Sequence, residues 1–203
     1  MLRSNYFLTT LLASGLVFSR AQAFLLDSVI GYATVSAEAA ESNNLNNELY
    51  FDETITRLGA GVYVVNNPLH LESEGWACVI KADTVKFNQV GKVWIPKSYQ
   101  RMTADDPREQ ENIWDESEEV IVDYIQTLMP EPGKALRFSW VRNRTNWQLR
   151  MLIPTKVVER DDLDLRADCF ESRDMMINEV GDIVPWLTWT IQGQSGGGAP
   201  SLK

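Results

Sequence analysis

Four arginines are concentrated in one short stretch of the chain, residues 135–154. They are Arg137, Arg142, Arg144 and Arg150. Guanidinium groups bind carboxylates and phosphates through paired N–H donors, so this concentration predicts a contact with an anionic group. The anion can be external, on a ligand or a protein partner, or it can be an acidic side chain of the same chain. We expect these four arginines to be the binding residues in the first case and ordinary paired surface side chains in the second.

An acidic stretch that precedes the arginines in the chain offers the internal alternative. Between Ala104 and Asp123 the sequence carries nine carboxylates and the single cation Arg108. Asp106 followed by Pro107 is a good helix start, and the apolar spacing downstream predicts a helix that ends by Met129. The acidic face of that helix can be solvated, can dock a basic partner, or can neutralise the arginines. The sequence leaves all three open.

Patterns typical of catalysis are largely missing. His70 is the only histidine, which excludes multi-histidine metal sites and the H-E-x-x-H zinc motif. Residues 193–197 match G-x-S-x-G, but they follow the last expected strand and no histidine comes after them. A glycosidase needs only two carboxylates and stacking aromatics, and no particular pair can be nominated. We expect no catalytic residue, no metal ligand and no cofactor.

The acidic run near residue 165 is the best candidate for cation binding, and it is a poor one. Oxygen-rich clusters bind Ca²⁺, but this run lacks the turn-forming glycine and the terminal glutamate of a calcium loop. Its members are Asp161, Asp162, Asp164 and Asp168.

Cys78 and Cys169 are the only cysteines. In an oxidising compartment they would form one disulfide that closes a long loop. The alternative is two unpaired cysteines, or a reactive thiol with His70 as its base.

Residues 1–23 have the pattern of a secretory signal peptide. Arg3 provides the positive start, residues 6–18 the apolar core, and Ala21-Gln22-Ala23 the small-x-small cleavage site. Cleavage would remove two arginines and no acid, and so change the net charge from −9 to −11. A chain this acidic is unsuited to sequence-independent binding of nucleic acid or anionic lipid. We expect a secreted or periplasmic protein without a stable membrane span.

The arginines must be positioned by a β-hairpin over residues 135–154. Strict alternation puts the residues at 136, 138 and 140 on one face with those at 147, 149, 151 and 153, so that face must be buried. A register that pairs Trp140 with Trp147 sets Arg137 opposite Arg150, and two facing cations require an anion. The two tryptophans are assigned to the core.

The remaining elements follow from periodicity and turn residues. We expect a helix at 24–40, a connector at 41–47, a strand at 61–65, a hairpin of 76–87 with 92–95, a sheet extension at 156–160, a last strand at 183–191 and a flexible tail at 193–203.

Together these features predict one α+β domain over residues 24–192, an antiparallel β-sheet of hairpins with one or two helices packed on one face. The expected function is an exported non-catalytic binding or interaction protein, such as an envelope accessory component or a protein inhibitor. The competing classes are a secreted hydrolase or glycan-binding module, and a purely structural subunit.

Overall fold

The computed structural model describes residues 27–46, 49–51, 54–101, 109–142 and 147–195 of the 203-residue chain. The expected signal peptide, the Asp106-Pro107 helix start, Arg144 and residues 196–203 of the expected tail lie outside the described residues.

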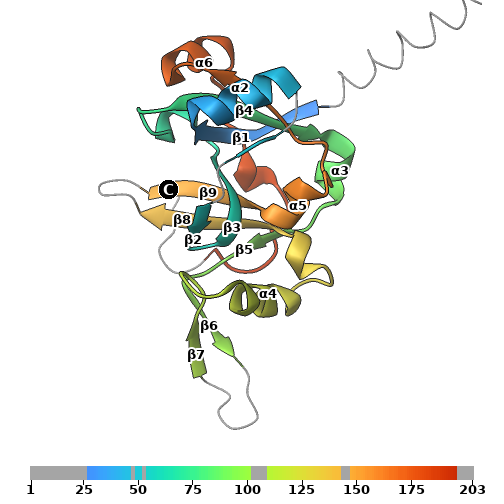
Figure 1. Ribbon diagram of the computed structural model, residues 1–203. Helices are drawn as coiled ribbons and strands as arrows, with labels where there is room; N and C mark the ends of the chain where they lie inside the picture. The colour runs from blue at the N-terminus through green and yellow to red at the C-terminus, as the bar shows by residue number, and fades with distance from the viewer. Residues whose placement is uncertain (1–26, 47–48, 52–53, 102–108, 143–146, 196–203) are drawn as a thin grey trace, which may run out of the picture.

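An eight-stranded sheet forms the centre of the fold (Figure 1). Its strand order is β10-β4-β1-β3-β9-β8-β5, and β2 adds to β3. Every pairing is antiparallel except that of β5 with β8. The strands are β1 (Asp27–Val35), β2 (Thr54–Thr56), β3 (Gly59–Val65), β4 (Trp76–Asp83), β5 (Lys92–Trp94), β8 (Leu136–Arg142), β9 (Trp147–Pro154) and β10 (Arg166–Phe170).

A separate two-stranded hairpin and five short helices complete the mixed α+β fold, which confirms the predicted class. The hairpin pairs β6 (Ser98–Arg101) with β7 (Glu109–Asn112). The helices are α2 (Ala37–Asn46), α3 (Thr84–Gln89), α4 (Glu118–Gln126), α5 (Thr155–Glu159) and α6 (Arg173–Glu179). In Figure 1, α2 and α6 lie beside β1 and β4 at one end of the molecule, while α4 and the β6–β7 hairpin lie at the other. In the described part of the chain, no helix is long and apolar enough to cross a membrane.

The β8–β9 hairpin is buried on both faces. The face predicted to be apolar packs into one core cluster, with Phe138 and Met151 fully buried. The opposite face, predicted to be basic and exposed, packs into a second cluster through Leu152, against Ile121 and Ile125 of α4. Alternation identified the first face correctly, but it could not show that a helix covers the second.

The register of this hairpin differs from the predicted one by two residues. Arg137 pairs with Leu152, and Arg150 pairs with Ser139. The prediction that the two arginines face each other is therefore wrong. A slip of two residues leaves every side chain on the same face, so the apolar pattern fits both registers equally well.

Arg137 is fully buried and its counter-charge comes from α4. The guanidinium donates to both carboxylate oxygens of Glu118, from Nη2 at 2.5 Å and from Nη1 at 2.9 Å. Nη1 also donates to the carbonyl oxygen of Leu58, at 2.7 Å, in the turn between β2 and β3. Gly59 has a φ of 104°, and a Cβ there would clash with both partners of the ion pair. The acidic helix thus neutralises this hairpin arginine internally.

The segment predicted as a last strand, residues 183–191, is instead an irregular strap around the short 3-10 helix η3 (Trp186–Thr188). Trp186 is fully buried, donates from Nε1 to the Ile30 carbonyl at 2.7 Å, and packs edge-on against Phe138. The strap then joins β5, where Gln192 exchanges backbone hydrogen bonds with Lys92 and Trp94. A strand in the sheet could not place this indole between β1 and β8.

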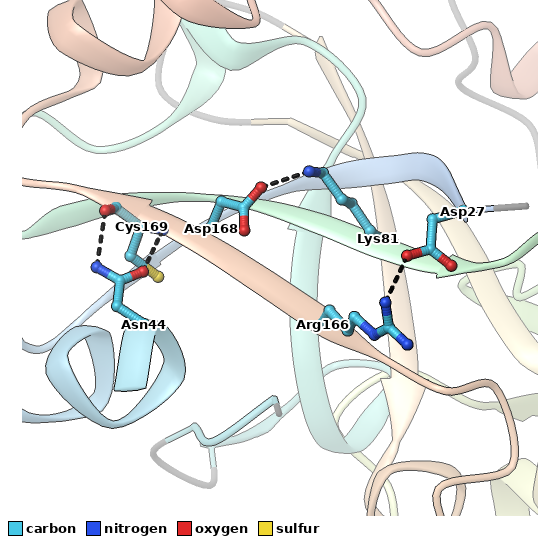
Figure 2. Close-up of polar contacts among 6 residues, drawn as sticks. All are labelled: Asp27, Asn44, Lys81, Arg166, Asp168 and Cys169. Atoms are coloured by element: carbon cyan, nitrogen blue, oxygen red, sulfur yellow. Dashed lines mark hydrogen bonds and ion pairs between the residues drawn. The ribbon is translucent and has the colours of Figure 1, made fainter. Parts of the chain in front are cut away.

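The predicted disulfide is confirmed between Cys78 of β4 and Cys169 of β10, which face each other in register with Cα atoms 4.0 Å apart. Asn44 of α2 brackets the backbone of Cys169, accepting from its N–H at 2.9 Å and donating to its carbonyl at 3.0 Å (Figure 2). The thiol alternative with His70 as base is therefore wrong. A disulfide is suited to an oxidising compartment.

Two cations of the same strands, Arg166 and Lys81, face each other in register. Figure 2 shows that each has its own carboxylate: Arg166 binds Asp27 at 3.0 Å, and Lys81 binds Asp168. These partners relieve the repulsion between facing like charges.

The predicted helix over residues 24–40 is wrong for residues 27–35, which form β1, and the expected connector at 41–47 is helical to Asn46. β1 contains an irregularity between Val29 and Gly31. An extra residue in a strand brings neighbouring apolar residues to one face and imitates a helical stripe.

Three further predictions fail where a helix replaces or shortens a predicted strand, or a strand shortens a predicted helix. The 76–87 segment leaves the sheet at Asp83, which accepts from the Lys86 N–H and caps α3, so β5 pairs with β8 and not with β4. The expected long acidic helix begins only at Glu118, since residues 109–112 form β7. The sheet extension expected at 156–160 is α5.

Replacing both cysteines with alanine should lower the free energy of unfolding by roughly 3 to 5 kcal/mol, because the bond closes a loop over a sequence separation of 91. Urea unfolding of the oxidised wild type and the variant measures the difference. Reductant should bring the wild type close to the variant and leave the variant unchanged. Equal stability of the oxidised proteins contradicts the prediction.

Glu118→Ala should lower the free energy of unfolding by about 3 kcal/mol, because it leaves the buried Arg137 cation without its carboxylate. The matched control is Glu119→Ala, which removes an exposed carboxylate from the same helical turn and should cost no more than about 0.5 kcal/mol. Adding Arg137→Met to Glu118→Ala should recover part of the loss. Equal effects of the two single variants in urea unfolding would refute the structural role of the pair.

Candidate functional site: an aromatic and cationic cleft

A cleft of about 810 Å³ lies where the β8–β9 hairpin, the β6–β7 hairpin, α4 and the end of the strap meet. Its volume is within the range of small-molecule and peptide sites. The described residues that line it are Arg57, Pro96, Lys97, Ser98, Tyr99, Gln100, Gln110, Trp114, Tyr124, Leu128, Trp140, Arg142, Trp147, Gly193, Gln194 and Ser195.

The cleft exists because β5 is short. Its pairing with β8 covers only residues 136–138, and the last bond on that side runs from the Ile95 N–H to the Phe138 carbonyl at 2.8 Å. Pro96 follows at once and has no N–H to continue the ladder. The chain then turns into the β6–β7 hairpin, which projects from the body of the molecule in Figure 1. This departure opens the space beside the end of β8.

Five aromatic side chains line the cleft, and backbone carbonyls hold two of them in place. Trp114 donates from Nε1 to the Ile95 carbonyl at 3.2 Å, and the Tyr124 hydroxyl donates to the Trp94 carbonyl at 3.2 Å. Tyr99 packs edge-on against Tyr124 with ring centroids 5.0 Å apart. Rings anchored in this way offer stacking faces without having to be ordered on binding.

The charges of the cleft are cationic, although the whole chain has a net charge of −9. Arg57, Lys97 and Arg142 line it, all three exposed, and no carboxylate is among its described lining residues. Arg57 is 4.0 Å from Asp115, at the limit of an ion pair, and its guanidinium lies 5.6 Å from the Trp114 ring centroid. A concave surface with one sign of charge concentrates ligands of the opposite sign.

The carboxylate nearest this lining is already engaged. Glu111 of β7 accepts from the Tyr99 hydroxyl at 3.1 Å and pairs with Arg101 at 3.2 Å. Burial raises the pKa of Tyr99, and the hydrogen bond with Glu111 raises it further. Burial also raises the pKa of Tyr124. Both phenols therefore stay neutral at physiological pH and leave the cationic character of the cleft intact.

The structure places three of the four arginines expected to bind together, and these three lie in different environments. Arg142 lines the cleft, Arg137 is buried in its pair with Glu118, and Arg144 lies outside the described residues. Arg150 is half-buried and donates to the side chain of Gln148 at 3.2 Å. It also lies near His70, whose pKa is lowered by burial and then by the Arg150 charge.

Sequence reasoning assigned Trp140 and Trp147 to the core, which is correct in part for Trp140 because it packs against the first core cluster, and it missed most of the other cleft residues. Trp140 and Trp147 share a face with core residues but sit where β8 and β9 reach their open end, and both remain partly exposed. Lys97, Tyr99 and Trp114 were not singled out as binding residues. The available signal was Pro96, which ends a strand and so predicts an unpaired edge beside it.

Other ionisable groups have structural partners. Burial lowers the pKa of Lys92 to about 8, and its ammonium donates to the Phe87 carbonyl at 2.6 Å at the end of α3. The acidic run near residue 165 pairs with lysines: Asp164 with Lys86 at 2.6 Å, and Asp162 with Lys134 at 3.5 Å. These contacts hold elements together around a smaller cavity of about 380 Å³.

Comparison with known proteins places the cleft inside a recognised family region. Residues 56–194 match the model of a family described as "Family of unknown function (DUF5910)". The match covers more than half of the chain and all of the cleft lining except Ser195. A comparison with curated proteins finds no match.

After each quenching constant is divided by that for free N-acetyltryptophanamide, iodide should quench the intrinsic fluorescence of this protein about twofold more strongly than caesium, because cations surround the partly exposed cleft tryptophans. High salt should remove most of the difference. Lys97→Glu combined with Arg142→Glu should also remove it. Stronger quenching by caesium, as the net charge of −9 alone would give, is the outcome that contradicts a cationic cleft.

Proposed function

The chain belongs to a family of unknown function, and from the cleft we propose that it is an exported, non-catalytic binding protein that holds an anionic ligand or an acidic segment of a protein partner. The observation that carries this proposal is the composition of the cleft. Three cations, five aromatic rings and several amides line it, and no carboxylate is among the described lining residues of a strongly acidic chain. Such a surface repels cations and favours anions with flat or extended parts.

Export is supported by two independent features. Residues 1–23 have the signal-peptide pattern, and the Cys78–Cys169 disulfide requires an oxidising environment to persist. A secreted or periplasmic location accounts for both.

The chemistry of the cleft favours binding over catalysis. General acid–base hydrolysis needs a titratable pair near the reacting bond, and the described lining offers arginine, lysine and neutral tyrosine side chains. Ser195 is the one lining residue of the G-x-S-x-G match, and the sequence after it contains no histidine to activate it.

A glycan-binding module is the second candidate, and one observation favours it. Tryptophan faces and amide side chains, here Gln100, Gln110 and Gln194 beside Trp114 and Trp147, are groups that stack on sugar rings and bind hydroxyls. The cleft cations distinguish an anionic ligand from a neutral glycan, because they do not stabilise the binding of an uncharged sugar.

The test is calorimetric titration of the full exported protein with a decaglutamate peptide, a tetragalacturonate and a neutral maltotetraose. We expect an acidic probe to bind and the neutral sugar not to bind. Lys97→Glu with Arg142→Glu should weaken that binding at least tenfold, because it reverses two cleft charges. The matched control, Lys156→Glu with Arg160→Glu, makes the same charge change on exposed residues at α5 and should have little effect.

Two results would contradict the proposal that the cleft binds an anionic ligand. Binding of maltotetraose that is indifferent to both charge reversals would favour the neutral glycan candidate. Equal weakening by the cleft and α5 variants would mean that net charge, and not the cleft, governs binding.

A further inference from the structure

The end of β8 is an open strand edge that faces the cleft. Successive residues of a strand direct their backbone groups to opposite edges. The Leu136 N–H bonds to Gly91, and the Phe138 carbonyl accepts from Ile95, so these two residues point toward β5. By the same alternation Trp140 and Arg142 present their N–H and carbonyl groups on that edge, beyond the reach of β5. Both residues line the cleft.

Of the described strands, β8 pairs only with β9 and β5, and the pairing with β5 stops at Phe138. Among the described residues, the backbone N–H and carbonyl groups of Trp140 and Arg142 have no strand partner on this edge, which continues into the cleft. Unpaired edges of this kind are templates for an added strand. Natural proteins often protect such edges from pairing with other chains. Here the edge lies in the cleft, so an added strand could reach it only through the cleft.

The side chains around the edge suit an extended acidic segment. Lys97 and Arg142 lie among the lining residues and are exposed, so each can meet a carboxylate of an incoming chain. Alternate residues of an added strand would face opposite ways, one set toward the aromatic wall that contains Trp114 and Tyr124. Main-chain hydrogen bonds then supply affinity, and the cations supply the preference for acidic sequences.

We infer that the cleft binds an extended acidic peptide segment of a partner protein, which adds as a strand to the β8 edge at Trp140 and Arg142. This inference rests on the proposed function and specifies its ligand. The chain's own last eight residues, GGGAPSLK, are a poor alternative occupant because they carry the cation Lys203 and no acidic side chain. An acidic glycan shares the charge but cannot form a β-ladder, and the experiments below separate it.

The first experiment selects ligands. A phage library of random decapeptides is panned against the full protein, with the Lys97→Glu, Arg142→Glu variant as counter-target. We expect enrichment of peptides in which acids alternate with apolar residues. Failure to enrich any peptide that depends on the two cations overturns the inference.

The second experiment tests the ladder with the best selected peptide. N-methylation of successive peptide amides should weaken binding at every second position by about three- to tenfold, the effect of one lost hydrogen bond, and leave the positions between nearly unchanged. A flat profile would show that the peptide binds through side chains alone. That outcome overturns strand addition but leaves the anionic cleft of the proposed function in place.

The third experiment removes a donor from the protein. Arg142→Pro eliminates one N–H at the end of β8, whereas Arg142→Ala removes only the charge. Proline is tolerated at an edge where the N–H faces outward. We expect the proline variant to bind the selected peptide about three- to tenfold more weakly than the alanine variant, with equal thermal unfolding of the two. Equal affinities overturn the edge assignment.

Amide hydrogen exchange supplies a readout that does not depend on variants. Bound peptide should slow exchange at the Trp140 and Arg142 N–H groups and leave Val141, which points to β9, unchanged. If tetragalacturonate binds the cleft without this protection while no peptide binds, the proposed function stands and strand addition is wrong. If neither binds, both fail.

Discussion

The buried guanidinium of Arg137 constrains the rest of the structure more than any other group. A cation with no exposed surface must have a carboxylate and further acceptors around it, or the fold could not bury it. Glu118 and the Leu58 carbonyl supply such partners to the two Nη groups from two different elements. The ion pair therefore fixes the start of α4 and the β2–β3 turn against the same hairpin. Gly59 is needed where the turn passes over the pair.

The cleft depends on the Arg137–Glu118 ion pair, although neither residue lines it. α4 begins at the ion pair and carries Tyr124 toward the cleft near its other end. The same helix buries Ile121 and Ile125 in the second core cluster, together with Leu152 of β9. The early end of β5 and the departure of the chain at Pro96 then determine how much of the β8 edge stays open. The proposed binding cleft thus lies where other elements cease to cover the sheet.

The periodic spacing of apolar residues correctly predicted the elements that bury one regular face. The alternation of β8 and β9 gave the correct core face. The two cysteines could be paired because a chain with two offers one disulfide. The apolar spacing of Ile121 and Ile125 located the body of α4 correctly.

The rest depended on contacts that no local window contains. The irregularity in β1 made a strand resemble a helix, and a register slip of two residues changed no side-chain face. Whether a tryptophan is covered by the core or lines the cleft depends on whether the neighbouring strand continues past it. For Trp140, the pairing of β5 with β8 ends two residues earlier, at Phe138. Of the three described arginines of this set, only Arg142 lines the cleft, and Arg137 differs from it because α4 covers Arg137 and supplies Glu118 as its partner.

The disulfide has a topological consequence for the cleft. Cys78 and Cys169 enclose β5 through β9 and α4 in one covalent ring, together with every cleft residue except Arg57 and the three from Gly193 onward. A single proteolytic cut inside this ring would leave the fragments joined as one molecule. The nicked protein could therefore keep its recognition surface at intramolecular concentration. Reduction of this one sulfur–sulfur bond would then release the fragments of the nicked protein.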